Sequence, residues 1–140
     1  MPLFQKQERL YLKKDIANLF EKGEKWTCFP FRIILAVSLE EIAKMPPASV
    51  LVSVSKRNFK NATDRNRLKR QIKEAYRLRK ETFHKHFTDL SSETKNSMLH
   101  IGFIYTSKVK EPWAIIDKKM ERALKEVLEK FKATTKTTDA

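Results

Sequence analysis

The chain has 140 residues, with 30 Lys or Arg against 17 Asp or Glu, which gives a formal net charge of +13. This excess favours a polyanionic partner. The length and a hydrophobic content of 41% fit one domain and exclude a second sizeable core. A single Cys28 excludes an internal disulfide, and two distant glycines, Gly23 and Gly102, exclude a glycine-rich phosphate loop. No apolar run approaches a membrane span or an export signal, so we expect a cytoplasmic protein.

The first half of the chain predicts one helix and two strands. Apolar residues at helical spacing over residues 10–20 predict a short helix that stops at Gly23. Residues 26–37 are rich in β-formers and predict a strand with Pro30 near its start. Residues 40–47 are interpreted as a connection, and the alternating valines of residues 49–54 predict a second strand.

In the second half the apolar period changes to that of a helix over residues 61–79, with Asn61 or Thr63 as its cap. A polar loop over residues 88–97 and a strand over 99–105 follow. A last helix is predicted from Pro112 to Phe131, because its apolar residues recur at steps of three and four. The order α-β-β-α-β-α predicts an α+β fold in a single domain over residues 1–133, followed by a disordered polar tail over 134–140.

Positive charge is concentrated in residues 55–80, which hold eleven basic and two acidic side chains. Residues 111–132 are balanced, with six basic and five acidic side chains. A helix turns by 100° per residue, so each side chain can be placed relative to Leu68 on the buried side. Arg65 then lies near the edge of the core, and Arg67 lies beyond the exposed stripe. Arg79 falls on the core side, but its place at the helix end would let its side chain reach solvent. The exposed stripe itself comprises Asn66, Lys69, Arg70, Lys73, Arg77 and Lys80.

Like charges at this spacing repel one another by a few tenths of a kcal/mol per pair, so folding alone does not explain the stripe. A solvated face that keeps a small protein soluble is the simpler alternative. We favour a partner with phosphates, because the stripe has one sign and is rich in arginine, which grips phosphate oxygens in pairs.

The residues Arg65-Asn66-Arg67-Leu68-Lys69-Arg70, followed by Ile72 and residues 74–77, resemble the RNR motif of the bacterial ribonuclease P protein family. Residues 52–57 resemble the strand that leads into that motif, and residues 8–10 and 19–23 resemble the N-terminal helix of the family. The resemblance covers about residues 4–132. One departure is the absence of a glycine often found before the motif, where Phe59-Lys60 stands instead, so the backbone of that turn is expected to differ.

The resemblance implies a single α+β domain of order α-β-β-β-α-β-α. Its mixed sheet would contain a left-handed βαβ crossover through the RNR helix, against the general right-handed preference. The additional strand would come either from splitting residues 26–37 or from the connection over residues 40–47.

The resemblance also implies the function: an accessory subunit of ribonuclease P that binds the catalytic RNA and the 5′ leader of precursor tRNA. Cleavage would belong to the RNA, which would also bind most of the Mg²⁺, and the protein would have no catalytic residue and no intrinsic cofactor. A cleft between the first helix and the sheet would take the leader. The residues implied for the RNA subunit are Arg65, Asn66, Arg67, Lys69, Arg70, Lys73 and Arg77, and those for the leader are Phe20, Phe31, Ile33, Lys56 and Arg57.

Three alternatives stay open beside this interpretation. A structural RNA-binding protein of the ribosomal type would use the same stripe. Phe20, on a short amphipathic helix, is as readily a core residue as a stacking surface for bases. Solubility would also explain Lys56 and Arg57.

His84, His86 and His100 lack metal-ligand spacing, and the carboxylates are scattered, so neither a protein metal site nor a protein-only nuclease is indicated. Neither DNA nor a membrane is expected as a partner.

Overall fold

The computed structural model describes residues 13–38, 48–90 and 98–138. A four-stranded mixed sheet of order β1-β2-β4-β3 forms the centre of the molecule. β1 pairs with β2 and β2 with β4 in antiparallel fashion, whereas β3 and β4 are parallel. The elements are α1 (Lys13–Lys22), β1 (Glu24–Cys28), β2 (Phe31–Ser38), β3 (Ala48–Val54), α2 (Ala62–Leu90), β4 (Met98–Tyr105) and α3 (Trp113–Thr138).

The strand predicted over residues 26–37 is two strands, joined by a tight turn at Phe29 and Pro30. Cys28 pairs with Phe31 across this turn. Proline has no N–H to give to a sheet ladder, so it is suited to the point where pairing is interrupted. The additional strand therefore comes from splitting residues 26–37. The alternative source, residues 40–47, lies almost entirely outside the described residues.

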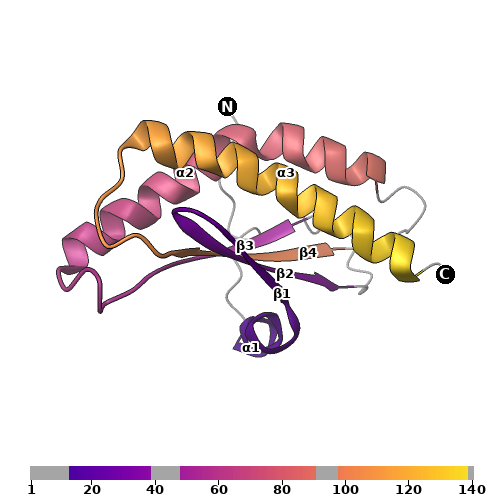
Figure 1. Cartoon of the computed structure of the whole chain (residues 1–140), viewed down its shortest axis with the longest axis horizontal. Coiled ribbons are helices and arrows are strands. Elements are labelled where there is room, and N and C mark those ends of the chain that lie inside the picture. The colour runs from indigo at the N-terminus through magenta and orange to yellow at the C-terminus, as the bar shows by residue number, and fades with distance from the viewer. Residues whose placement is uncertain (1–12, 39–47, 91–97, 139–140) are drawn as a thin grey trace.

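The helices form layers on both faces of the sheet: α2 and α3 cover one face and α1 lies against the other (Figure 1). The main core fills the space between the sheet and the helix pair. It includes Phe31, Ile33 and Leu35 of β2 together with the apolar sides of α2 and α3. A smaller cluster on the opposite face is centred on Leu19 of α1 and Ile34 of β2. Because neighbouring residues of β2 belong to different clusters, the two faces of the strand are both partly covered.

Helix α1 ends where the sequence predicts. The amide of Gly23 donates to the carbonyl of Leu19 at 2.9 Å, and a Cβ at Gly23 would lie 2.4 Å from that same oxygen. Only glycine fits this close approach, so Gly23 lets the chain leave the helix and enter β1 directly. Residues 10–12, which the sequence assigns to this helix, lie outside the described residues.

Both long helices extend further than the sequence predicts. α2 runs to Leu90 rather than to residue 79, because Phe83 and Phe87 continue its buried stripe against α3. The ring of Phe87 packs on that of Phe131 with centroids 4.9 Å apart. Residues 88–90, predicted as part of a polar loop, therefore belong to α2, and the rest of that prediction falls outside the described residues. α3 runs to Thr138, into the segment for which disorder is predicted, because a formed helix extends at little cost.

The parallel neighbours β3 and β4 are joined through α2, as the resemblance implies for the crossover. Within the described ranges, none of the helices is both apolar enough and long enough to cross a bilayer.

Candidate nucleic-acid interface

The first turn of α2 is fixed by a side-chain cap. The amide of Thr63 donates to Oδ1 of Asn61 at 3.0 Å, and the amide of Arg65 donates to the Asn61 carbonyl at 3.2 Å. Asn61, rather than Thr63, is therefore the cap that the sequence left undecided. Asp64 follows in the first turn and pairs with Lys110 at 2.7 Å, which ties the helix start to the loop before α3.

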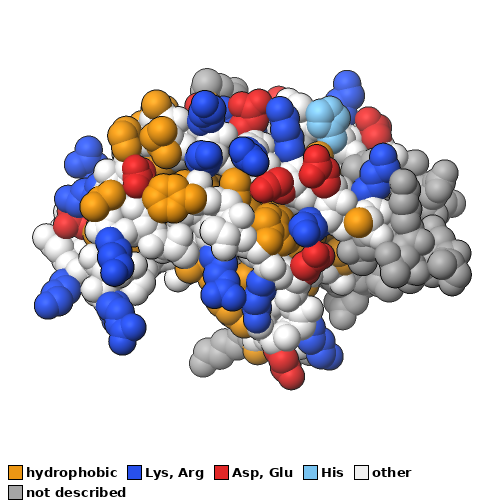
Figure 2. Space-filling model, in the orientation of Figure 1, with side chains coloured by type: hydrophobic (Ala, Val, Ile, Leu, Met, Phe, Trp, Pro, Cys, Tyr) orange, Lys and Arg blue, Asp and Glu red, His pale blue; other side chains and the backbone are white. Residues whose placement is uncertain are grey.

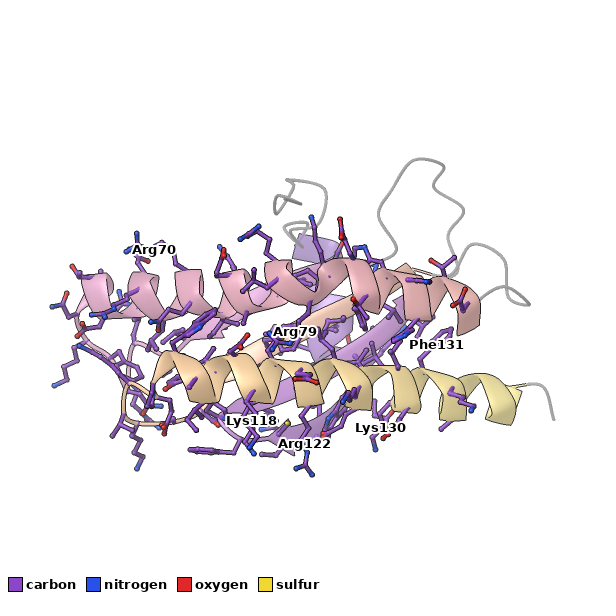
Figure 3. All side chains as sticks on the ribbon, turned by 90° about the horizontal axis from the view of Figure 1, so that it is seen from above. Arg70, Arg79, Lys118, Arg122, Lys130 and Phe131 are labelled. Atoms are coloured by element: carbon purple, nitrogen blue, oxygen red, sulfur yellow. The ribbon has the colours of Figure 1, made fainter. Side chains whose placement is uncertain are left out.

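The outer side of α2 carries a shallow depression lined by residues from three successive turns. Figure 3 shows Arg70 on this side, pointing away from α3. Asn66 and Arg70 are exposed, and Lys69 and Lys73 are half-buried. Neither Lys69 nor Arg70 forms an ion pair with any residue in the described ranges, so their charge is available to a ligand. The lining residues are Thr63, Asn66, Lys69, Arg70 and Lys73, at steps of three and four, as the predicted stripe requires.

Arg67 lies beyond this stripe, as predicted, and is exposed. Together with Arg70 it lines a second shallow depression, whose other walls are Gln71, Glu74 and Trp113. Arg70 therefore belongs to both depressions and makes them one continuous surface. The sequence did not assign Trp113, at the start of α3, to RNA binding. Its position beside two arginines follows only from the packing of α3 on α2.

Arg65 has a different task from its neighbours in the motif. Its Nη1 donates to the carbonyls of Phe59 and Lys60 at 2.7 and 2.9 Å. The ring of Phe59 is buried and lies 5.9 Å from that of Tyr105. Phe59 thus anchors the turn between β3 and α2 to the core, and Arg65 fastens its backbone. This is how the chain forms the turn in which the glycine is missing.

Arg77 is also engaged within the protein. Its guanidinium forms an ion pair with Glu74, in which Nε donates to Oε2 at 2.8 Å and Nη2 to Oε1. The hydrogen bond from Arg77 lowers the pKa of Glu74, and the same bond raises the pKa of Arg77. Arg77 lies on the predicted side of α2, but its charge is largely matched by Glu74.

Two basic residues near the end of the predicted helix are not part of an open surface. Lys80 is only 6% exposed, so its assignment to the exposed stripe is wrong. It lies beside Tyr76 at the edge of the buried side, where the long apolar stem of lysine is readily covered. Arg79 lies between α2 and α3 (Figure 3), where it forms an ion pair with Asp117 and lies 3.7 Å from Glu121. The hydrogen bond that Arg79 donates to Asp117 raises the pKa of Arg79.

Over α3, acidic and basic side chains are mixed on the face shown in Figure 2. This agrees with the balanced charge of residues 111–132. Figure 3 shows Lys118, Arg122 and Lys130 on the side of α3 that faces away from α2. Of these, Lys130 is paired with Glu24 of β1 at 3.4 Å. The positive charge at the start of α2 is therefore a local feature rather than a general property of the surface.

The prediction that Phe31 and Ile33 bind the leader is wrong. Both side chains are fully buried in the core beneath α2 and α3, so no base can reach them. The physical reason is the strand register: alternate residues point to opposite faces, and the odd-numbered ones face the helix pair. Phe20 of α1 is 39% exposed and remains available for stacking.

The α1 side of the sheet has a different and more polar lining. Arg32 of β2 is paired in register with Thr27 of β1 and with Ile104 of β4, which in turn pairs with Ser53 of β3. Arg32 and Thr27 are exposed. We call these four residues the open row; it adjoins the row of Ile34 and Gly102, on which Leu19 packs. A lone arginine among the apolar residues of β2 is the sequence signal that marks this face.

Lys56 and Arg57 lie three and four residues after Ser53 in the chain, and both are exposed. The amide of Arg57 donates to Oγ of Ser55 at 3.1 Å, which shapes the start of the turn. The two cations stand in the turn that leads from the open row to the first residues of α2.

In the described part of the chain, no three His, Cys, Asp or Glu side chains lie close enough to hold a metal ion. His84 lies 2.9 Å from the hydroxyl of buried Tyr76, so its ring is used in packing and hydrogen bonding within α2.

Comparison with known proteins identifies relatives of this arrangement. A family model described as Ribonuclease P matches residues 4–92. The ribonuclease P protein component of Porphyromonas gingivalis is 32% identical over 119 residues, covering 85% of this chain and 82% of the relative. That of Petrotoga mobilis is 39% identical over 80 residues, covering 57% and 63%.

Solved structures share the fold. The RNase P protein from Thermotoga maritima superimposes with a TM-score of 0.60 at 20% identity, covering 85% of this chain and 96% of that one. A mutant RNase P protein from Staphylococcus aureus gives a TM-score of 0.61 at 20% identity, covering 86% and 87%. At this level of identity the structural likeness establishes the fold, and the curated relatives carry the family assignment.

Proposed function

Because the chain belongs to the ribonuclease P protein family, we propose that it binds the catalytic RNA of ribonuclease P through α2 and the 5′ leader of precursor tRNA through the α1 side of the sheet. The observation that carries this proposal is the depression on α2, which is lined by Asn66, Lys69 and Arg70 of the RNR motif and by Lys73 one turn further along the helix. Family membership favours this function over the ribosomal alternative.

The α2 surface suits a folded RNA backbone. Arg70 presents a planar fork that pairs with two phosphate oxygens, and Lys69 and Lys73 supply point charges one turn apart. Asn66 adds an amide that both donates and accepts. Each phosphate neutralised in this way releases counterions, so the affinity falls steeply with salt. Arg65 and Arg77 support this surface indirectly, since their guanidiniums are bound to the turn and to Glu74.

The leader would lie along the open row rather than on Phe31 and Ile33. Arg32 and the pair Lys56 and Arg57 supply positive charge for the leader phosphates. Thr27 and Ser53 offer hydroxyl groups, and the exposed ring of Phe20 offers a stacking surface. Base stacking tolerates any sequence, which suits an enzyme that processes many different leaders.

Cleavage itself is assigned to the RNA subunit, which would also hold most of the Mg²⁺. The protein's contribution is binding and orientation: it holds substrate and RNA together and screens the repulsion between their phosphates. This work would take place in the cytoplasm, where precursor tRNA is made in bacteria.

The test is reconstitution. The purified protein alone is expected to leave precursor tRNA intact, and to restore leader removal at low Mg²⁺ when mixed with a bacterial ribonuclease P RNA. Arg70→Ala should weaken assembly far more than Lys125→Ala, a matched control on α3 whose side chain is 71% exposed. Equal losses in both variants would contradict a localised binding surface. Binding to RNA without any gain in leader removal would favour the ribosomal alternative.

A further inference from the structure

The start of α3 exposes a large aromatic side chain next to the basic surface of α2. Trp113 is 38% exposed and is absent from both apolar clusters of the described residues. The next apolar residue of α3 that is fully buried is Ile116. The other tryptophan, Trp26, is in contrast packed against the main core, with the ammonium of Lys130 5.5 Å above its ring. Trp113 therefore does less for packing than its size would allow.

The loop that presents Trp113 is held firmly. The hydroxyl of buried Tyr105 donates to the carbonyl of Val109 at 2.5 Å and accepts from the amide of Glu111 at 2.9 Å. Burial raises the pKa of Tyr105, which keeps this hydroxyl protonated. Oγ of Ser107 accepts from the amide of Val109 at 3.2 Å. A ring on so braced a loop loses little conformational freedom when a ligand covers it.

The charges around Trp113 favour an anion beside its ring. Arg67 and Arg70 line the same depression as Trp113, and neither forms an ion pair within the described ranges. The carboxylate of Glu74 also faces this depression, but it is bound to Arg77. An aromatic face with two uncommitted guanidiniums beside it matches the chemistry of a nucleotide, which has a flat base and a phosphate.

We propose that Trp113 is a stacking platform for an unpaired base of the RNA subunit, with Arg67 and Arg70 holding the adjacent phosphates. The proposal rests on the proposed function and extends its site from α2 to α3. Because Arg70 lines both depressions, a single strand can run from Asn66 and Lys73 to Trp113. Bases within a duplex are already stacked on their neighbours, so the platform selects a bulge, a loop or a strand end.

The experiment uses the full chain with Trp26→Phe, which leaves Trp113 as its sole tryptophan. A bacterial ribonuclease P RNA is expected to quench the emission of Trp113, because a stacked base opens a path for non-radiative decay. A long RNA duplex, in which nearly all bases are paired and stacked on their neighbours, should quench it much less. This readout needs no substitution at Trp113 itself, so it holds even where a variant at that position fails to fold.

Affinity measurements on variants complete the test. Trp113→Leu should weaken binding of the ribonuclease P RNA by about 5- to 100-fold, as expected for loss of one stacked base, whereas Trp113→Phe should stay within a few-fold of the parent. Val109→Ala, which alters an apolar side chain 61% exposed in the same loop, should change nothing. Because stacking involves no charge, Trp113→Leu should leave the slope of log affinity against log salt concentration unchanged. Arg70→Ala should reduce that slope by about one, because one phosphate contact is lost.

The stacking platform would be wrong if Trp113→Leu binds the RNA as tightly as the parent and the RNA does not quench the emission of Trp113 in the Trp26→Phe protein. If the RNA still binds with a steep salt dependence in that case, the proposed function stands. Equal quenching by the duplex would also overturn it. If the ribonuclease P RNA does not bind the parent protein at all, both the platform and the proposed function are wrong.

Discussion

Leu19 of α1 packs directly over Gly102 of β4, and a Cβ at Gly102 would lie 3.2 Å from Cδ2 of Leu19. Leu19 is fully buried, although it belongs to the shortest of the described helices. The contact, together with the partly buried Ile16 of the same helix, holds α1 against the side of the sheet that carries the open row.

Replacing Leu19 by alanine is therefore expected to lower the free energy of unfolding by about 2 to 4 kcal/mol, as for other buried leucines. Chemical denaturation measures this loss. Phe20→Ala is the matched control on the next residue. It should lower the free energy of unfolding far less, because the ring is 39% exposed, and should instead weaken leader binding. Similar destabilisation by both changes would mean that Phe20 is a core residue.

Arg32→Ala should weaken binding of precursor tRNA with a leader by about tenfold, since a hydrogen bond to a charged group contributes about 1.5 kcal/mol. Affinity for mature tRNA, which has no leader, should not change. Filter binding of both RNAs to the reconstituted holoenzyme measures the difference. A loss of the same size with mature tRNA would place Arg32 outside the leader site.

Phe31→Ala provides the contrast on the other face of β2. This side chain is fully buried, so its loss should lower the free energy of unfolding by about 3 to 5 kcal/mol. Any loss of leader affinity in this variant should follow the fraction of unfolded protein and disappear at low temperature. A specific loss in fully folded Phe31→Ala would restore the original assignment of this residue.

Arg65→Met should lower the free energy of unfolding by about 1 to 2 kcal/mol, because the carbonyls of Phe59 and Lys60 lose their donor. Arg67→Met, two residues along and exposed, should change stability little while weakening RNA binding. Thermal unfolding and RNA affinity, measured on both variants, separate the two roles. If the two variants are equally stable, Arg65 does not have the structural role assigned to it.

The Glu74 and Arg77 pair predicts a dependence on pH. The pKa of Glu74 is lowered in the folded state from an ordinary value of 4.5, so its contribution to stability is present above that value and is lost as the pH falls through the lowered pKa. Glu74→Gln should therefore lower the melting temperature at pH 7, and the difference from the parent should shrink below pH 4. Glu81→Gln, an exposed residue of the same helix, should show no such trend.

Local periodicity predicted the basic side of α2 and the order of the elements apart from one strand, which only the family resemblance supplied. Leu68, Ile72 and Tyr76 define the buried side wherever the helix is placed, so Asn66, Lys69, Arg70 and Lys73 must lie opposite. The family motif then supplied the interpretation of that side. These are the parts of the site that sequence alone could give.

What failed depended on register and on distant partners. A shift of one residue reverses the face of every side chain in a strand. The sequence left open whether residues 26–37 are split, so the face of Phe31 and Ile33 was undefined. Lys80 was misplaced because covering a long side chain depends on neighbouring elements. The neighbours of Arg79 and Trp113 are determined by the packing of α3 on α2. No local sequence pattern in either helix predicts that packing.

The turn of residues 55–61 fixes the position of the start of α2 relative to the end of β3. β3 ends at Val54 and α2 begins at Ala62, and Arg65 and Phe59 clamp the backbone between them. The strand that supplies Ser53 and the helix that supplies Arg70 are thus parts of one stiff body. A leader on one surface and a ribozyme on the other would therefore be kept at a constant separation. The protein would in this way determine which part of the substrate strand reaches the cleaving RNA.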